Sequence, residues 1–306
     1  MTATDRVATG PRRDLVETVA ARALGYPYRM WGFGEGMALL GIVRAGRLLD
    51  RPQWIDAVAD LVAPTLSGPA DPTDHLIAVD VLRELARHRP LPVDGAVARF
   101  TNAVAGARRT VPGQPPVHRP DLPGLASLVW VDCLHTDGPG LPPPTAAPLI
   151  EECAAVLQNG SGLFSHGYDV ATGRANAVHW GRGQGWALHG LAAVAPGHEA
   201  SADRLARLIA ALRRYEQDGS WRTIVDDPDA PVEHSVSALV AACPAVEVPL
   251  RGRALAAALR ALDGNGGLPV SAATPVGSAA TYLDRDTGVF PWGQGPLLLA
   301  LLLEER

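Results

Sequence analysis

The sequence predicts an all-α fold, an (α/α)6 barrel of six helical hairpins. A W-G-x-G motif begins at Trp31, Trp180 and Trp292, and each copy leads into an apolar run. Segments with amphipathic or apolar helical periodicity follow one another in pairs, and few segments alternate as strands do. The second members of these pairs recur about every 50 residues, which is in the period range of stacked repeats.

Each pair combines two kinds of helix. The first member usually carries charges on one face, whereas the second is almost wholly apolar beyond its first turn, so we expect outer and inner helices. The predicted outer helices are 14–24, 52–66, 93–108, 145–157, 200–215 and 250–262. The predicted inner helices are 33–49, 74–87, 125–135, 185–194, 233–242 and 296–303. The cleft of such a barrel would lie at the N-termini of the inner helices.

Three further segments are expected to form short hairpins at the rim of this cleft. Segments 160–171, 219–225 and 282–290 are rich in glycine, aspartate and aromatic residues. The chain has 306 residues and 47% hydrophobic content, enough for a large core. Because no run of glycine, serine, proline or charge resembles a linker, we predict a single catalytic domain over residues 1–306.

The composition argues against several function classes. The 27 basic and 32 acidic residues give a net charge of −5 without blocks of either sign, which argues against a nucleic-acid partner. Every basic residue is arginine, so a lysine Schiff base or lysine general base is excluded. No apolar stretch is long enough for a membrane span, and the N-terminus has no apolar signal region. The isolated Cys133, Cys153 and Cys243 fit a reducing, cytoplasmic location.

Five of the six predicted inner helices begin with polar side chains that would face the cleft. These are Asp74 and His75, Asp132 and His135, His179, Arg182 and Gln184, Glu233, His234 and Ser235, and Gln294. No cluster among them has the spacing of metal ligands. The GRGQG segment lacks the preceding strand and the lysine of a phosphate loop. We therefore predict a site without metal or cofactor.

Asp132 is the strongest candidate for acid catalysis. It lies among apolar residues in LVWVDCLH, and such a setting favours the protonated carboxyl, which can then donate a proton near neutrality. A helix cap or an ion pair with arginine explains Asp132 equally well. Asp74 follows Asp71-Pro72-Thr73, where an N-cap is the simpler explanation.

Four other side chains have both a binding and a structural explanation. Arg182, between two glycines at a helix start, could hold a substrate carboxylate in a bidentate contact, or it could bridge loops. His166, in LFSHGYD, suits a sugar ligand and a backbone-bonded loop histidine equally. Trp180 and Trp186 suit core packing at least as well as a sugar platform.

Taken together, these segments resemble the unsaturated glucuronyl and rhamnogalacturonyl hydrolases, glycoside hydrolase families 88 and 105, which are (α/α)6 barrels. The resemblance runs from Trp31 to Leu303. It is carried by LVWVDCLH (128–135), GLFSHGYD (162–169), HWGRGQGW (179–186), GSWRTIVDDPDAPVEHSVSAL (219–239) and WGQGPLLLALL (292–302). It implies a general acid at Asp132 and a second active-site aspartate at Asp74, with Asp71 and Asp80 as alternatives to Asp74. Substrate contacts are expected from His166, Trp180, Arg182, Gln184, Trp186, Trp31 and His135.

The resemblance also implies a reaction. Such enzymes hydrate the C4=C5 double bond of the 4,5-unsaturated uronic acid that polysaccharide lyases leave at a chain end. Asp132 would protonate C4, water would add at C5, and the hemiketal would open and expel the remaining sugar. Asp74 would stabilise the cationic centre or orient the water. The substrate would be a small unsaturated oligosaccharide or glycoside.

Two other functions stay open at this point. The chain is short for the family and has only 5% aromatic residues, which favours a disaccharide or a non-carbohydrate aglycone over an extended polysaccharide. A sugar epimerase or isomerase on the same barrel would use a pair of cleft histidines, such as His166 and His234. An inactive barrel could instead serve binding, or act as a tailoring protein in secondary metabolism.

Overall fold

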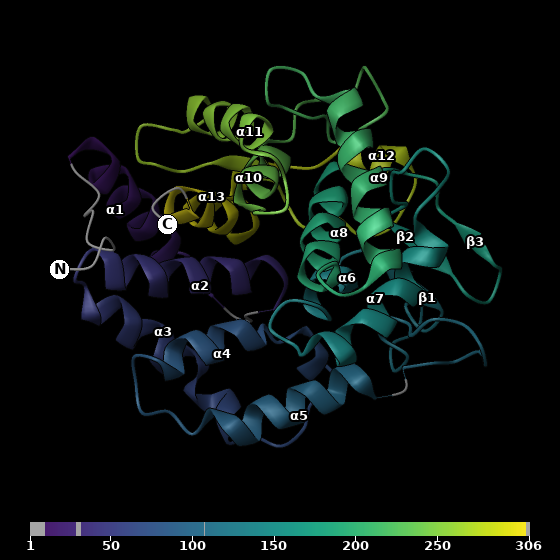
Figure 1. Ribbon diagram of the computed structural model, residues 1–306, viewed down its shortest axis with the longest axis horizontal. Helices are drawn as coiled ribbons and strands as arrows, with labels where there is room; N and C mark the ends of the chain where they lie inside the picture. The colour runs from purple at the N-terminus through teal and green to yellow at the C-terminus, as the bar shows by residue number, and fades with distance from the viewer. Residues whose placement is uncertain (1–9, 29–31, 107, 304–306) are drawn as a thin grey trace.

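The computed structural model describes residues 10–28, 32–106 and 108–303, and these are mainly helical (Figure 1). The helices are α1 (Pro11–Leu24), α2 (Phe33–Leu48), α3 (Pro52–Leu66), η1 (Asp74–Leu76), α4 (Val79–Ala86), α5 (Val93–Ala105), α6 (Cys133–Thr136), α7 (Pro143–Leu157), α8 (Gly181–Val194), α9 (Glu199–Tyr215), α10 (His234–Ala242), α11 (Val248–Arg260), α12 (Ala279–Leu283) and α13 (Pro291–Leu303). The strands are β1 (Leu128–Trp130), β2 (Gly167–Asp169), β3 (Arg174–Ala175), β4 (Pro269–Ser271) and β5 (Thr287–Val289).

The inner helices close into a ring. Each element packs against the next in the order α2, η1 with α4, α6, α8, α10 and α13, and α13 returns to α2. The outer helices cover this ring, with α1 and α3 against α2, α5 against α4, α7 against α6 and α8, α9 against α8, and α11 against α10. The predicted (α/α)6 barrel is therefore confirmed.

Burial follows the predicted division into inner and outer helices. Every residue of α10 from Ser235 to Ala242 is buried, because this helix is apolar or small on all sides. In α9 the buried side includes Leu205, Leu208 and Leu212, and the arginines of that helix lie mostly toward solvent. Among the described residues, none of the helices combines the length and the hydropathy that crossing a membrane requires.

The glycines of the W-G-x-G motifs allow two inner helices to approach closely. A Cβ at Gly34 would lie 2.4 Å from the Cβ of Trp292, and a Cβ at Gly295 would lie 2.4 Å from the backbone nitrogen of Ala38. Both distances are too short for any side chain, so α2 and α13 can cross here only with glycine. Trp31, in the first motif, lies outside the described residues.

The predicted inner helix 125–135 is wrong. Its first part forms β1, which pairs antiparallel with β2 so that Val129 lies opposite Tyr168. Val129 and Val131 are fully buried, whereas Trp130 between them is only partly buried. This alternation is typical of a strand, and β-branched and aromatic residues favour strands. Only the residues after Asp132 are helical, in α6, which ends at Thr136 just beyond the segment.

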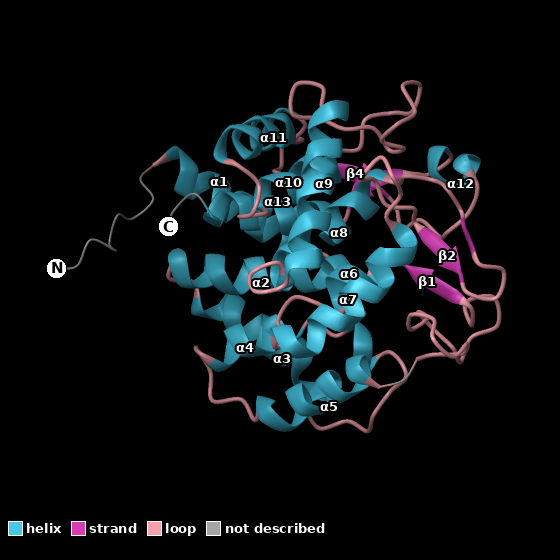
Figure 2. Ribbon diagram, turned by 45° about the vertical axis from the view of Figure 1, so that its right-hand side comes forward, coloured by secondary structure: helices cyan, strands magenta, loops and turns pink. Residues whose placement is uncertain are grey.

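The predicted helix 74–87 is divided into η1 and α4. Ile77, between them, has an extended backbone and forms a β-bridge with Gly32, which interrupts the helical hydrogen bonds. One of the three expected hairpins forms, since β2, in segment 160–171, pairs with β3 just after that segment. Segment 282–290 contains β5, which pairs with β4 on the other side of α12 and so makes no hairpin of its own (Figure 2). The third segment, 219–225, contributes isolated bridges such as Trp180 to Ile224.

Candidate active site

A cavity of about 370 Å³ lies at the end of the ring where the inner helices begin. Its walls come from the start of α2, the β1–α6 turn, the first turns of α8 and α13, and the loop after β4. The lining residues are Phe33, Gly34, Glu35, Trp130, Asp132, Trp180, Arg182, Trp186, Ala273, Thr274, Pro275 and Trp292. The cleft predicted at the N-termini of the inner helices is thus confirmed, and described residues of all three W-G-x-G motifs line it. Aromatic walls with few polar groups are typical of a small-molecule site.

Asp132 lies in the wall of this cavity, between β1 and α6. Its backbone precedes the first residue of α6, but its side chain caps no helical N–H. Among the described residues, the close polar contact of its carboxylate is with His166, whose Nε2 lies 3.3 Å from Oδ2, and Oδ2 itself makes no hydrogen bond. Neither structural alternative for Asp132, a helix cap or an arginine partner, therefore accounts for it.

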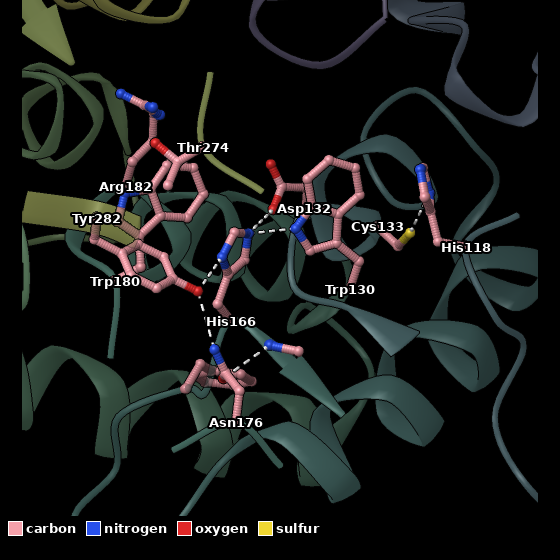
Figure 3. Close-up of polar contacts among 12 residues, drawn as sticks. His118, Trp130, Asp132, Cys133, His166, Asn176, Trp180, Arg182, Thr274 and Tyr282 are labelled. Atoms are coloured by element: carbon pink, nitrogen blue, oxygen red, sulfur yellow. Dashed lines mark hydrogen bonds and ion pairs between the residues drawn. The ribbon is translucent and has the colours of Figure 1, made fainter. Parts of the chain in front are cut away.

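His166 lies behind Asp132 and is fully buried (Figure 3). Its Nε2 faces Asp132 and also contacts Nε1 of Trp130, while its Nδ1 lies 2.8 Å from the hydroxyl of Tyr282. Burial lowers the pKa of His166, and the neighbouring Asp132 opposes this shift. The residue is not among those that line the cavity. Its place beside the carboxylate suits it to position Asp132, and the expected contact with the sugar stays a prediction.

Tyr282 anchors His166 from α12, which is 116 residues further along the chain. Its hydroxyl also accepts hydrogen bonds from Nδ2 of Asn176 at 2.9 Å and from the backbone nitrogen of Gly277 at 3.2 Å. The hydroxyl therefore joins the strand region around β3, the loop before α12 and the imidazole behind Asp132.

Trp180 and Trp186 both line the cavity and are 2% exposed. The Trp180 ring lies 4.3 Å from that of His166, and Trp186 stacks on His135 at 4.9 Å. Neither indole nitrogen has a hydrogen-bond partner among the described residues. A buried N–H donor without a partner is unusual, and a hydroxyl of a bound ligand would satisfy it.

Arg182 lines the cavity, but its guanidinium is bound to protein. Nη1 donates to the carbonyl and hydroxyl of Ser271 at 3.0 and 3.1 Å, and Nη2 donates to the carbonyl of Ala272 at 2.8 Å. Glu233 lies 3.5 Å from Nη1 and balances the charge. Of the two explanations left open for Arg182, these contacts support a bridge from α8 to the end of β4 and the residue after it, and its grip on a substrate carboxylate stays a prediction.

Two other predicted substrate contacts also have structural roles. The Gln184 amide is fully buried, accepts from the backbone nitrogen of Phe164, and donates to the carbonyls of Phe164 and Trp180. His135 lies beneath Trp186, and its Nε2 is 3.3 Å from the carbonyl of Phe33. Burial lowers the pKa of His135 to about 3, so it is neutral. Neither is among the residues that line the cavity, and their expected contacts with the substrate stay predictions.

Asp74 is not among the residues that line the cavity either, and its assignment as the second active-site carboxylate stays a prediction. Its Oδ2 lies 3.0 Å from Nε of Arg99 and accepts from the backbone nitrogen of Asp71 at 3.1 Å. Asp71 is exposed and bonds Thr73. Asp80 lines a separate cavity of about 320 Å³ near the C-terminal ends of α2 and α13. None of the three candidates therefore shares the cavity of Asp132.

Glu35 is the second carboxyl in this cavity, and the sequence reasoning missed it. It lies in the first turn of α2, is 7% exposed, and has an Oε2 without a hydrogen-bond partner among the described residues. The available signal was a single charge in the otherwise apolar segment FGEGMALLGIV. Within the described part of the chain, no group of three or more His, Cys, Asp or Glu side chains is arranged to hold a metal ion.

Comparisons with known proteins agree with this architecture. Residues 149–306 match the family model described as Glycosyl Hydrolase Family 88. YesR, an unsaturated rhamnogalacturonyl hydrolase of Bacillus subtilis, is 32% identical over 158 residues, which cover 45% of this chain and 45% of that protein. The aligned part thus spans just under half the length of this curated relative.

Solved structures of similar fold cover nearly the whole chain. A possible member of the GH105 family from Klebsiella pneumoniae has a TM-score of 0.76 at 17% identity, over 100% of this chain and 96% of that one. The unsaturated glucuronyl hydrolase of Bacillus sp. GL1 has a TM-score of 0.63 at 15% identity, over 95% of each chain. At these identities the likeness shows the fold.

Proposed function

The chain belongs to glycosyl hydrolase family 88, and we propose that it hydrolyses glycosides of 4,5-unsaturated uronic acids by hydrating the C4=C5 double bond. The observation that carries this proposal is the carboxyl of Asp132, which lies 3.3 Å from His166 in the wall of a cavity with two unpartnered indole N–H groups. The names of YesR and of the Bacillus sp. GL1 enzyme support the same substrate class.

Asp132 is the proton donor in the proposed reaction. The protonated carboxyl gives its proton to C4 of the vinyl ether, and positive charge develops at C5 and the ring oxygen. Water adds at C5, and the ionised Asp132 accepts the proton that this water loses. The hemiketal opens to a ketone at C5, and the hemiacetal left at C1 expels the aglycone. This route needs no pair of carboxylates flanking the glycosidic bond.

The remaining walls bind the sugar. The indole N–H groups of Trp180 and Trp186 donate to hydroxyl groups, and their rings cover apolar faces of the sugar ring. A cavity of about 370 Å³ has room for the terminal unsaturated ring, with the aglycone directed outward. A small unsaturated oligosaccharide or a glycoside with a small aglycone fits this volume.

The epimerase and isomerase reading has no support from the geometry. It needs two histidines facing one substrate, and neither His166 nor His234 lines the cavity. An inactive barrel would bind the unsaturated sugar without changing it. Replacing Asp132 with Asn separates these possibilities, since only the hydration route needs the transferable proton.

The direct test is to incubate the protein with lyase-generated unsaturated disaccharides from several polysaccharides and follow the absorbance of the vinyl ether. The proposal predicts loss of this absorbance with at least one substrate. Asp132→Asn should slow the loss by at least about 100-fold, as expected for a missing general acid. Unchanged absorbance with all substrates, or near-normal turnover by Asp132→Asn, would argue against the proposal.

We also propose that residues 1–306 act as one catalytic domain in the cytoplasm. The closed ring of inner helices supports a single domain, and the three free, buried cysteines support a reducing compartment. Limited proteolysis that releases two independently folded fragments would contradict the first statement. Recovery of the protein outside the cytoplasmic fraction would contradict the second.

A further inference from the structure

Glu35 lines the same cavity as Asp132 and has no role in the proposed reaction. Its carboxyl and that of Asp132 are both in the lining, and Oε2 of Glu35 is buried without a hydrogen-bond partner among the described residues. A buried carboxyl oxygen without a partner is costly unless a ligand or a proton satisfies it.

The titratable groups around Glu35 come from every neighbouring element. Tyr28 precedes α2, the β1–α6 turn contributes Asp132 and His135, and α8 contributes Arg182. From η1, His75 is neutral, since burial lowers its pKa to about 3, and Asp74 is paired with Arg99. The first turn of α13 contributes Trp292 and no charge.

No cation among these groups holds Glu35 in its ionised form. Arg182 is the cation in the lining, and its charge is matched by Glu233 while its donors reach Ser271 and Ala272. Burial raises the pKa of Glu35 to about 7, and the hydrogen bond with its own backbone only partly opposes this. The carboxyl is therefore neutral at mildly acidic pH and is easily protonated at neutrality.

A uronate would bring a third carboxyl into this cavity. An ionised Glu35 would repel it, whereas a protonated Glu35 offers an O–H donor, and such charge-assisted hydrogen bonds are short and strong. We propose that protonated Glu35 donates a hydrogen bond to the carboxylate of the bound uronate. The inference rests on the proposed function for its substrate class, and it makes Glu35 a binding residue rather than a proton donor to C4.

This role couples binding to proton uptake. The bound carboxylate stabilises the protonated form of Glu35, so its pKa rises further in the complex. Below pH 7 most Glu35 is already protonated, so binding is accompanied by little proton uptake. Above pH 7 the free protein has lost this proton, so binding takes up nearly one proton, and affinity falls by about tenfold per pH unit.

Calorimetry with glucuronate at pH 8 tests this without requiring turnover. Titrations in two buffers of different ionisation enthalpy give the number of protons taken up on binding. The wild-type protein should take up close to one proton. Glu35→Gln keeps an N–H donor but cannot titrate, so it should bind glucuronate with no uptake. Glu247→Gln, the same change at the partner of Arg213 on the surface, should behave as wild type.

A second measurement uses only the wild-type protein and covers the case in which Glu35→Gln does not fold. Its affinity for glucuronate should fall about tenfold between pH 7.5 and 8.5, while its affinity for the glucuronate methyl ester should not change. Absence of proton uptake, equal uptake by Glu35→Gln, or no binding of glucuronate overturns the inference. A protein that takes up the proton but leaves the vinyl ether absorbance unchanged retains this inference and loses the proposed reaction.

Discussion

The polar side chains in this cavity differ in whether contacts with the protein already engage them. Among the described residues, no helical N–H and no arginine binds the carboxyl of Asp132, whereas Arg182 donates to Ser271 and Ala272. The same cavity thus contains one polar group that is available and one that holds the wall together. Stability measurements distinguish these two roles.

Arg182→Met should destabilise the fold and should not select between substrates. The change leaves Glu233, 2% exposed, without its cation, so we expect a loss of about 3–5 kcal/mol in the free energy of unfolding. Urea unfolding measures this. Arg213→Met, which removes the cation of a surface pair with Glu247, should cost under about 1 kcal/mol. Near-normal stability with activity lost only on the free uronate, and not on its methyl ester, would show that Arg182 holds the substrate carboxylate.

The sequence predicts residue roles only where near neighbours decide them. Asp132 is identifiable because the apolar residues that enclose it are adjacent in the chain. The partners of Arg182 and Gln184 lie in other parts of the chain, Ser271 at the end of β4 and Phe164 before β2, so spacing does not reveal that these side chains are already hydrogen-bonded. Glu35 was missed because its own segment does not show that it faces the cavity. That depends on where α8 and β1 lie.

Among the elements, α12 is a short helix that contacts the site through one group, the hydroxyl of Tyr282. Tyr282→Phe leaves Nδ1 of His166 and the amide of Asn176 without this partner. We expect a loss of about 1–3 kcal/mol in stability and a fall of roughly tenfold in kcat, with KM little changed, because Asp132 is held less firmly. Tyr215→Phe, which removes a hydroxyl that makes no hydrogen bond with the described residues, is the control. Equal kinetics in the two variants would contradict a positioning role for Tyr282.

The crossing of α2 and α13 depends on glycine. Gly295→Ala places a Cβ 2.4 Å from the backbone nitrogen of Ala38, so the helices must separate, and we expect a loss of about 1–3 kcal/mol. Gly252→Ala is the matched control, since it lies on the exposed side of α11 with no atom within 4 Å of the new Cβ. There the greater helix propensity of alanine should add about 0.5–1 kcal/mol. Thermal unfolding compares the two, and a stable Gly295→Ala would mean that the helices do not need this contact.

Helix positions could be predicted from the sequence wherever the apolar residues of a segment followed a single, helical periodicity. α3 has the predicted bounds, and α10 and α13 begin within a few residues of theirs. Segment 125–135 failed because its apolar residues suit both a buried helix and a buried strand, and pairing with β2 decides between them. The break at Ile77 likewise depends on Gly32, a partner distant in the sequence.

Over the whole molecule, the ring places the starts of α2, α8 and α13 around one cavity. Repeat spacing predicted this arrangement because each hairpin buries its inner helix only against its neighbours. The size of the cavity and the identity of its second carboxyl depend on how far each inner helix extends. The spacing of the repeats does not predict this extent. The central claim is that this cavity delivers a proton to C4 of an unsaturated uronate.

The measurement that tests this claim most directly is proton NMR of the reaction in D2O, with an unsaturated disaccharide that the protein consumes. Hydration predicts that the vinyl proton signal at C4 disappears as the aglycone is released. The early product should carry one deuterium on one face of C4. Asp132→Asn should slow both changes together by at least about 100-fold. Release of a free sugar that keeps its C4 vinyl signal would show cleavage at C1 without hydration and would contradict the account.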